Sequence, residues 1–504
     1  MIRVVVIGLA VTSVAFLGAD TPVAGPEFQL VQPELFSAPG GMPNAWADFD
    51  NDGQLDEFVG FRGRPNRLYK QNHGRFEDVA AEVGLADNIE TRAAAWGDYD
   101  ADGNVDLYIG FVDGTPNKLY RNDPSAGSGS TRAESRAEGN GRHFTDVAHA
   151  LGVDLKGVTR QVSWIDYDND GDLDLFIAFR DQPNRLFRND GGRFTDVTRE
   201  SGIGDPRKTV GAVWFDMDGD GDLDLFVANQ NGDTNGLFRN DGGHFVDVAR
   251  EWGVEAPRAS EAFGGVGPAV ADFDGDGLFD LFVANYGPSA LYRNAENRRF
   301  VDVTKAAGLV FNQHATTPSW GDYDNDGRQD LYVAGFLVNV AHYPDHLFHN
   351  DGGTFSDVIS AFVTEHDASH GVQWIDFDQD GALDLALTNN DPGGGHYLFR
   401  NVLPAARARQ SLSVDVVDSR GRHTRPGAEV RVYAAGTRRL ISSGLVDTGG
   451  GYCSQNVAPV HVATAGASRV DVEVTTMSLN GRRVTKIAGI DSKTSPRPVV
   501  VKVP

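Results

Sequence analysis

Aspartate residues recur at one fixed spacing seven times in this chain of 504 residues. The first copy is Asp48-Phe-Asp50-Asn-Asp52-Gly53-Gln-Leu-Asp56, and the same D-x-D-x-D-G-x-x-D pattern begins again at Asp98, Asp166, Asp216, Asp272, Asp322 and Asp376. Carboxylates at alternate positions of a tight loop converge, and they repel one another unless a cation lies among them. A flexible, anionic set of oxygen ligands favours Ca²⁺ over Mg²⁺. The pattern therefore predicts about seven Ca²⁺ ions, and no other cofactor is expected.

Each loop offers carboxylates at positions 1, 3, 5 and 9, while the glycine at position 6 supplies the turn that folds the loop over the ion. Position 7 varies in side chain, which indicates that it contributes only its backbone carbonyl. The predicted metal ligands are, loop by loop, Asp48, Asp50, Asp52, Gln54 and Asp56; Asp98, Asp100, Asp102, Asn104 and Asp106; Asp166, Asp168, Asp170, Asp172 and Asp174; Asp216, Asp218, Asp220, Asp222 and Asp224; Asp272, Asp274, Asp276, Leu278 and Asp280; Asp322, Asp324, Asp326, Arg328 and Asp330; Asp376, Asp378, Asp380, Ala382 and Asp384.

An EF-hand begins in the same way but requires a bidentate glutamate at position 12. Position 12 is apolar in all seven copies, from Val59 in the first to Leu387 in the last. The aspartate at position 9 instead leads directly into alternating apolar residues such as Leu225-Phe226-Val227, which is typical of a β-strand. We therefore expect each metal loop to be the turn of a β-hairpin.

The loops recur every 50 to 68 residues, and two further signatures follow them, the second in six of the seven copies. One is Leu-Tyr or Leu-Phe, as at Leu68-Tyr69, and the other is Phe-x-Asp-Val, as at Phe76–Val79. Six of the seven tryptophans stand two residues before a metal loop, and we expect them to pack between neighbouring units. Four short strands per unit, repeated seven times, predict an all-β fold with a seven-bladed β-propeller over residues 27–403. The seventh unit lacks Phe-x-Asp-Val, so the isolated Phe28–Val31 segment is expected to supply its fourth strand.

The N-terminal segment and the composition indicate where the protein is located and which partners are excluded. Residues 1–19 resemble a secretory signal peptide, with Arg3 before an apolar run, which predicts a secreted protein, extracellular or periplasmic, without a membrane span after cleavage. An uncleaved anchor is the alternative. The net charge of −26 argues against nucleic acid as a partner. The single cysteine, Cys453, excludes an intrachain disulfide, and it is expected to be a buried thiol. A Gly/Ser-rich stretch between Asn122 and Phe144 is expected to be a flexible loop.

From about residue 404 the repeat stops. Alternating segments at 412–417, 429–433, 438–442, 470–475 and 499–503 predict a separate, sandwich-like all-β domain over residues 404–504.

The seven loops with their blade signatures resemble the FG-GAP/VCBS repeats, the calcium-binding blades also found in the integrin α-subunit head. Residues 404–504 are similar to the ASPIC/UnbV domain in Arg425–Val430, Gly450–Tyr452, Ser454-Gln455 and Asn480-Gly481. The chain departs from that domain at His461–Gly466 and near Met477–Leu479. The combination is similar to the cartilage acidic protein family. This resemblance implies calcium binding outside the cell and adhesion or interaction, and it implies no reaction.

No nucleophile elbow, phosphate-binding loop, dinucleotide fingerprint or zinc spacing is present, so we expect no catalytic residues and no enzyme. Six histidines fall on the face opposite the metal loops: His314, His342, His346, His366, His370 and His396. They would form a glycan, metal or acid–base site if they converged, although scattered surface histidines are the simpler interpretation. The favoured function is a calcium-stabilised scaffold for an extracellular protein or polysaccharide. The alternative is a calcium-dependent carbohydrate-active enzyme, similar to a polysaccharide lyase, using that opposite face.

Overall fold

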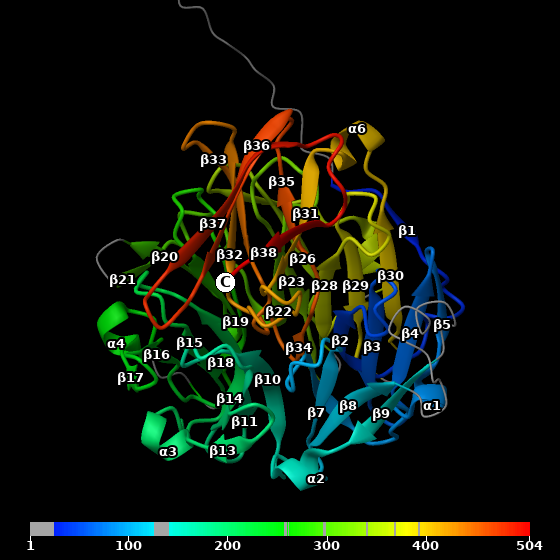
Figure 1. Ribbon diagram of the computed structural model, residues 1–504, viewed down its shortest axis with the longest axis vertical. Helices are drawn as coiled ribbons and strands as arrows, with labels where there is room; N and C mark the ends of the chain where they lie inside the picture. Colours follow the sequence, from blue (N-terminus) through cyan, green and yellow to red (C-terminus); the bar gives the residue numbers. More distant parts are fainter. Residues whose placement is uncertain are drawn as a thin grey trace, which may run out of the picture.

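Seven blades, each built on four antiparallel β-strands, follow one another along the described part of the chain and form a propeller (Figure 1). The computed structural model describes residues 25–124, 141–256, 260, 262–295, 299–338, 341–366, 369–391 and 394–504. The predicted signal segment 1–19 lies outside these residues, as does most of the Gly/Ser-rich stretch.

The first four blades repeat one pattern, in which an inner strand ends at a metal loop and three strands follow outward. They are β2 (Gly41–Ala47), β3 (Asp56–Phe61), β4 (Arg67–Asn72) and β5 (Arg75–Asp78); β6 (Thr91–Gly97), β7 (Asp106–Phe111), β8 (Lys118–Pro124) and β9 (Arg142–Asp146); β10 (Thr159–Ile165), β11 (Asp174–Phe179), β12 (Arg185–Asn189) and β13 (Phe194–Asp196); β14 (Thr209–Phe215), β15 (Asp224–Asn229), β16 (Gly236–Asn240) and β17 (Phe245–Asp247).

The last three blades vary this pattern slightly. They are β18 (Gly264–Ala271), β19 (Asp280–Pro288), β20 (Ala290–Ala295) and β21 (Arg299–Asp302); β22 (Asn312–Gly321), β23 (Asp330–Gly335), β26 (His346–Asn350) and β27 (Phe355–Asp357); β28 (Gly371–Ile375), β29 (Asp384–Thr388), β30 (His396–Asn401) and β1 (Phe28–Leu30). A two-stranded excursion, β24 (Leu337–Val338) and β25 (Ala341–His342), precedes β26. Blades five and six are joined because β19 also pairs with β22.

The N-terminal strand closes the ring as predicted. β1 pairs antiparallel with β30, with Phe28 opposite Asn401 and Leu30 opposite Phe399. Blade seven also packs on blade one through a cluster that contains Trp46, Phe61, Ile375 and Leu398. Because closure pairs the outer edge of the last blade with the start of the chain, no blade is left one strand short.

Hydrophobic clusters lie between each pair of neighbouring blades, and the predicted tryptophans occupy them. Trp96, for example, is buried with Phe58 of blade one and Leu107 of blade two. In the fifth repeat, Val270 stands at the tryptophan position, and Trp252 from the preceding helix is buried in the same cluster. The tryptophans are therefore packing residues, and the seventh compensates for the one repeat that lacks its own.

Short helices connect the blades, and the sequence analysis did not predict them. They are α1 (Ala80–Val83), α2 (Ala148–Leu151), α3 (Thr198–Ser201), α4 (Ala249–Trp252) and α5 (Ala361–Thr364), and a further one, α6 (Ala405–Ala408), follows the propeller. The aspartate of Phe-x-Asp-Val begins the turn, because Asp78 Oδ1 accepts a hydrogen bond from the Ala80 N–H at 3.2 Å. Gly84, at φ 91°, ends α1 in the left-handed conformation that glycine favours.

Two further sheets form the C-terminal domain. They contain β31 (Ser411–Val417), β35 (Val460–Ala463) and β38 (Val499–Lys502) in one sheet, and β32 (Glu429–Ala434), β33 (Leu440–Leu445), β36 (Arg469–Thr476) and β37 (Arg483–Asp491) in the other. A valine-rich core that includes Val414, Val432 and Val472 joins the two sheets. All five strands predicted for this region are present, and β35, β37 and the short β34 (Ser454–Gln455) are additional.

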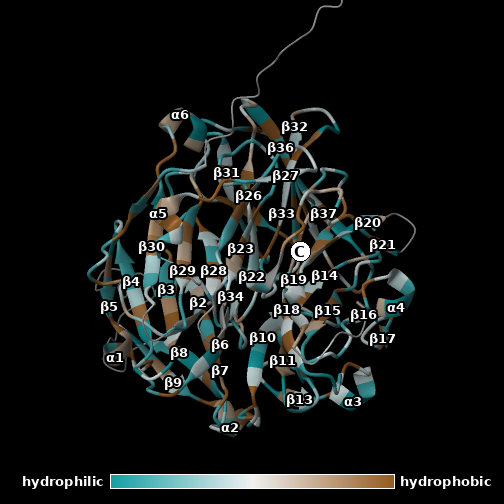
Figure 2. Ribbon diagram, turned by 180° about the vertical axis from the view of Figure 1, so that it is seen from behind, coloured by the Kyte–Doolittle hydropathy of each residue, from teal (hydrophilic) through white to brown (hydrophobic). Residues whose placement is uncertain are grey.

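The C-terminal domain lies against the propeller, with its orange and red strands in front of the upper half of the ring in Figure 1. Seen from behind in Figure 2, hydrophobic residues concentrate within strands such as β3 and β29. β34 does not pair within its own domain but adds to blade two, parallel to β6, with Ser454 opposite Ala94. No helix among the described residues is long and apolar enough to cross a membrane.

Candidate metal centres

The metal loops bring their carboxylates together as the sequence predicted. In loops one to four, ligand atoms of positions 1, 3 and 9 lie within 4.8 Å of one another: Asp48, Asp50 and Asp56; Asp98, Asp100 and Asp106; Asp166, Asp168 and Asp174; Asp216, Asp218 and Asp224. Three buried oxygens at position 1, Asp98 Oδ1, Asp166 Oδ1 and Asp272 Oδ1, have no hydrogen-bond partner. Oxygens that converge in this way and accept no hydrogen bond fit a bound cation.

The backbone of each loop orients these carboxylates. In the first loop, the Gly53 N–H donates to Asp48 Oδ2 at 2.8 Å, and the Phe49 N–H donates to Asp56 Oδ2 at 3.3 Å. The position 7 N–H donates to the position 5 carboxylate in every loop, as from Gln54 to Asp52 at 2.9 Å. Coordination by the position 7 carbonyl and by the position 5 carboxylate stays a prediction.

Burial raises the pKa of the carboxylates at positions 1 and 9 of the metal loops. It is the main cause that raises the pKa of Asp48, Asp98, Asp166, Asp216 and Asp376, all at position 1, to about 7. At position 9, burial raises the pKa of Asp280 to about 9. Neighbouring carboxylates raise these pKa values further, since like charges disfavour ionisation. A divalent cation among them would hold them ionised at neutral pH, so the residues present fit Ca²⁺.

The third strand of each blade supplies two residues that the sequence analysis did not assign to the site. The first is basic in all seven blades: Lys70, Arg121, Arg188, Arg239, Arg293, His349 and Arg400. Lys70 Nζ lies 2.5 Å from Asp50 Oδ2, and Arg293 lies 3.7 Å from Asp274. In blades two to four the arginine instead pairs with the aspartate two residues further on, outside the metal loop. In the sixth blade, His349 forms a potential metal-binding group with Asp324 and Asp326. In the sequence, the basic residue that follows Leu-Tyr or Leu-Phe in every repeat is the signal that could have placed a basic side chain beside each metal loop.

The second residue is asparagine, or glutamine in the first blade, and it joins neighbouring metal loops. The backbone N–H of Asn240 donates to Asp224 Oδ1 at 2.8 Å. Its side-chain amide donates to Leu223 O in the same loop at 3.2 Å and to Tyr167 O in the preceding loop at 2.8 Å. Corresponding bonds to the preceding loop come from Gln71, Asn122, Asn189, Asn294, Asn350 and Asn401. A complete circle of amide bridges therefore links the seven loops.

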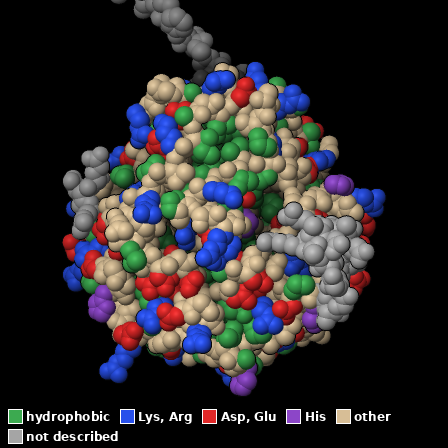
Figure 3. All heavy atoms as spheres, viewed as in Figure 1, with side chains coloured by type: hydrophobic (Ala, Val, Ile, Leu, Met, Phe, Trp, Pro, Cys, Tyr) green, Lys and Arg blue, Asp and Glu red, His purple; other side chains and the backbone are tan. Residues whose placement is uncertain are grey.

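The C-terminal domain covers the metal-loop face with basic side chains. Arg425 lies 3.7 Å from Asp166 Oδ2, Arg482 lies 3.3 Å from Asp216 Oδ2 and Arg497 lies 3.8 Å from Asp376 Oδ2. Arg422, Arg431 and His461 reach residues of loops two, five and six. Basic side chains also lie among acidic ones near the middle of the face shown in Figure 3. Six of the seven loops thus contact this domain.

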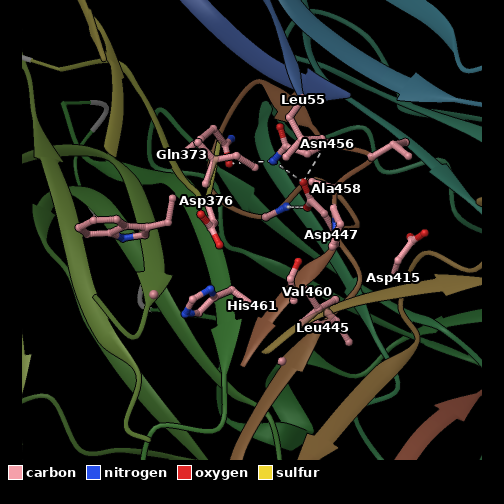
Figure 4. Close-up of a pocket in the computed structure, with 18 of the residues that line it drawn as sticks. Leu55, Gln373, Asp376, Asp415, Leu445, Asp447, Asn456, Ala458, Val460 and His461 are labelled. Atoms are coloured by element: carbon pink, nitrogen blue, oxygen red, sulfur yellow. Dashed lines mark hydrogen bonds between the residues drawn. The ribbon is translucent and has the colours of Figure 1, made fainter. Parts of the chain in front are cut away.

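A cavity of about 370 Å³ lies between the domain and the loops (Figure 4). Asp376 and Gln373 line it from the propeller, and Asp415, Asp447 and His461 line it from the C-terminal domain. Asp48, Asp98 and Asp322, all at position 1, also border it. The cavity therefore provides polar space beside four of the predicted ion sites.

Residues 447–457 extend from the C-terminal domain into the centre of the ring. Thr448 Oγ1 donates to Trp214 O of blade four at 2.8 Å, and the Gly451 N–H donates to Pro268 O of blade five at 2.7 Å. Gln455 bonds both the N–H and the carbonyl of Trp164 in blade three, and Asn456 accepts from the Trp46 N–H of blade one. We call residues 447–457 the axial plug, because they contact inner strands around the ring.

The six histidines on the opposite face do not form one cluster. His396 is buried against Glu57, with Nε2 3.0 Å from Oε1. His346 pairs with Asp357 at 2.6 Å, and His366 lies against Tyr397. His314 and His370 approach the axis among aromatic rings, while the side chain of His342 lies outside the described residues. The six histidines therefore do not form the convergent site. They are not all surface residues either, because His370 and His396 are buried in the core.

The fold and loops define a β-propeller whose hairpin turns carry clustered aspartates that could hold a metal ion. Residues 48–109, 166–227, 216–283 and 272–333 match the FG-GAP-like repeat. Each match runs from one metal loop through the next, so the propeller contains FG-GAP-like repeats. No curated protein matches the chain in sequence.

Solved structures similar to this chain include BBS1N in complex with ARL6DN, at a TM-score of 0.44 and 11% identity over 75% of this chain and 97% of that one. A lectin from Agrocybe aegerita that recognises non-reducing terminal N-acetylglucosamine has a TM-score of 0.38 and 17% identity over 73% and 90%. The computationally designed protein Ika8 has a TM-score of 0.40 and 10% identity over 75% and 100%.

Proposed function

We propose that the protein is an exported, calcium-stabilised scaffold that binds an extracellular protein or polysaccharide on the face opposite its metal loops. The observation that carries this proposal is the contact of the C-terminal domain with six of the seven loops. Since that domain covers one face, a large partner has access to the other. The metal loops then have a structural role, fixing the inner hairpins that present the open face.

Residues 404–504 are proposed to be an ASPIC/UnbV-like domain, as the resemblance in Arg425–Val430 and Gly450–Tyr452 implies. In this chain its proposed role is to cap the metal loops and supply the axial plug. Arg482 supports this role, because its guanidinium contacts both Glu429 of its own domain and Asp216 of the fourth loop.

Calcium removal tests the structural role of the loops. Chelation is expected to lower the Tm by more than about 10 °C, and added Ca²⁺ to restore it, because a ligand that binds only the folded state stabilises that state. Differential scanning calorimetry in EDTA, Ca²⁺ and Mg²⁺ measures the effect, and metal analysis of the purified protein counts the ions. Identical melting curves in EDTA and Ca²⁺ would contradict the proposal.

A carbohydrate-active enzyme is the second candidate, and one observation favours it. Tyr286, His314 and Tyr343 lie together near the axis on the open face, with ring centroids 4.6 and 5.0 Å apart. A tyrosine beside a histidine supplies a proton donor and an acceptor. Incubation with uronate polymers, followed by detection of unsaturated products, separates the candidates: a scaffold leaves the polymer intact.

A further inference from the structure

Two arginines face the axis at equivalent places in neighbouring blades. Arg92 in β6 and Arg160 in β10 each stand where the pairing of the inner strand shifts by one residue, a bulge that turns a side chain out of the ladder. The same irregularity includes Met42 in blade one and holds Val210 and Val266 in blades four and five. In blade six the irregularity falls on the buried Thr316 and Thr317. The two cations are therefore set among apolar residues and two threonines.

Neither guanidinium has an acidic partner in the described part of the chain. Arg160 is 8% exposed; its one hydrogen bond runs from Nη1 to Tyr452 Oη at 3.0 Å, and its Nε is buried without a partner. Arg92 directs Nη1 to the Met42 sulfur at 3.1 Å, and its Nε is likewise buried without a partner. The nearby Glu90 pairs with Arg62 instead. Burying a cation without a counter-charge is costly, so this arrangement points to a ligand that completes it.

The axial plug lies against the two arginines through Tyr452. Tyr452 stacks on His370 with ring centroids 5.1 Å apart, and Arg92 lies 5.9 Å from the Tyr452 ring. Both ring nitrogens of His370 are buried without a partner. Burial, together with the charges of Arg92 and Arg160, lowers the pKa of His370 well below its usual value, so the imidazole is neutral. His370 therefore adds no positive charge to that of Arg92 and Arg160, whereas Arg180 lies close enough to Arg160 to lower its pKa.

Aromatic rings extend from His370 toward the face opposite the metal loops. Phe336 lies 5.9 Å from His370 and 5.6 Å from Tyr286, and His314 lies between Tyr286 and Tyr343. Arg92, Tyr286, His314, Phe336 and Tyr343 are half-buried, so they reach solvent. Planar rings beside a pair of guanidinium groups suit a ring-shaped ligand that carries an anionic group.

We propose that Arg92, Arg160 and the Tyr452 hydroxyl bind the carboxylate of an acidic saccharide, while Tyr286, His314 and Tyr343 contact the sugar ring. Guanidinium groups match carboxylates in geometry and form hydrogen bonds about twice as strong as neutral ones. The proposal rests on the proposed function in taking the open face as the binding face, and it adds the chemical class of the ligand. Because Tyr452 comes from the C-terminal domain, the site exists only when the axial plug is in place.

Binding of uronate oligosaccharides to the full chain in Ca²⁺ tests this proposal. Isothermal titration with glucuronate and galacturonate oligomers is expected to show binding, and neutral glucose and galactose oligomers at least ten-fold weaker binding. Arg160→Gln should lower the affinity for the acidic oligomers by at least about ten-fold. Arg199→Gln removes the same charge from an exposed site on α3 and should leave the affinity unchanged. Equal binding of acidic and neutral oligomers, or equal affinity of Arg160→Gln and the unchanged protein, would overturn the proposal.

Thermal unfolding, without and with the monosaccharide glucuronate, keeps the proposal testable if no oligomer of the right linkage is chosen. Arg160→Gln should raise the Tm by roughly 2–4 °C in anion-free buffer, because it removes an uncompensated buried charge. Glucuronate should raise the Tm of the unchanged protein and not that of the variant. Stabilisation by inorganic sulfate but by no uronate would overturn the saccharide assignment. Capture of a protein or neutral glycan that Arg160→Gln does not affect would overturn this site and leave the scaffold function standing.

Discussion

At the scale of single residues, burial decides what each polar group can do. Asp224 is fully buried yet accepts hydrogen bonds from the Asn240 and Met217 N–H groups, which orient it toward its metal loop. Cys453 is also buried, and its pKa is raised to about 12 by burial, so the thiol is a packing group as the sequence analysis expected. His370 belongs to the same class, because it is 2% exposed and neutral.

His370 predicts a measurable pH dependence. Burial and two nearby arginines lower its pKa in the folded protein, whereas the unfolded chain takes up a proton near pH 6.5. Stability attributed to this residue is therefore complete above pH 6.5 and is lost as the pH falls below it, by up to about 1.4 kcal/mol per pH unit. His370→Phe keeps an aromatic ring without the titration. Urea unfolding at pH 7.5 and 5.5 in saturating Ca²⁺ should show a smaller loss for the variant, and equal losses would contradict this assignment.

At the scale of elements, the blades are joined by packing and by the asparagine bridges. Tryptophans such as Trp96 and Trp214 fill the spaces between blades, and the Trp96 indole donates to Ala45 O of the preceding blade at 3.1 Å. The amide bridges act at the metal-loop end of the same interfaces. A metal loop is thus held by its own blade and by the next one, which couples each predicted ion site to its neighbour.

Replacing a bridge should loosen two loops together. Asn240→Asp keeps the shape of the side chain but cannot donate to Tyr167 O and Leu223 O, and it places a carboxylate beside Asp224. We expect a loss of about 2–4 kcal/mol in the free energy of unfolding, since buried carbonyls lose their donors. Asn480→Asp, at an exposed turn, makes the same chemical change and should cost less than about 0.5 kcal/mol. Similar losses for the two variants in urea unfolding would show that the bridge contributes nothing.

At the scale of the whole molecule, the axial plug joins the propeller and the C-terminal domain into a single structural unit. Asp447 shapes the plug, because its carboxylate accepts hydrogen bonds from the Gly449 N–H and the Asn456 N–H at 2.7 and 2.8 Å. The plug then bonds blades one, three, four and five and adds a strand to blade two. Independent unfolding of the two parts would break all of these contacts.

The plug predicts cooperative unfolding that a single substitution weakens. Gln455→Ala removes the hydrogen bonds to the Trp164 N–H and carbonyl, both of which are buried. We expect a loss of about 2–3 kcal/mol in the free energy of unfolding. Calorimetry should show one transition for the unchanged protein and a broader or divided transition for the variant. Two transitions in the unchanged protein would mean that the parts unfold separately.

The sequence by itself determined the features that depend on short or regularly repeated spacing. The nine-residue loops were predicted because their carboxylates converge within one turn, and the seven blades were predicted because each repeats the same four-strand pattern. The closing strand at Phe28 was predicted because the seventh repeat lacked a fourth strand, and β1 confirms it. The one-turn helices were missed because four residues are too few to show a helical period.

Only the tertiary structure decided how the C-terminal domain sits and what the ring encloses. Gln455 and Trp164 are 291 residues apart in the chain, so no local pattern indicates that they meet. The same is true of Arg160 and Tyr452, which no repeat relates. Both contacts depend on the packing of two domains against each other. The energetic cost of burying an unpaired charge can be recognised only when every neighbour of the side chain is known.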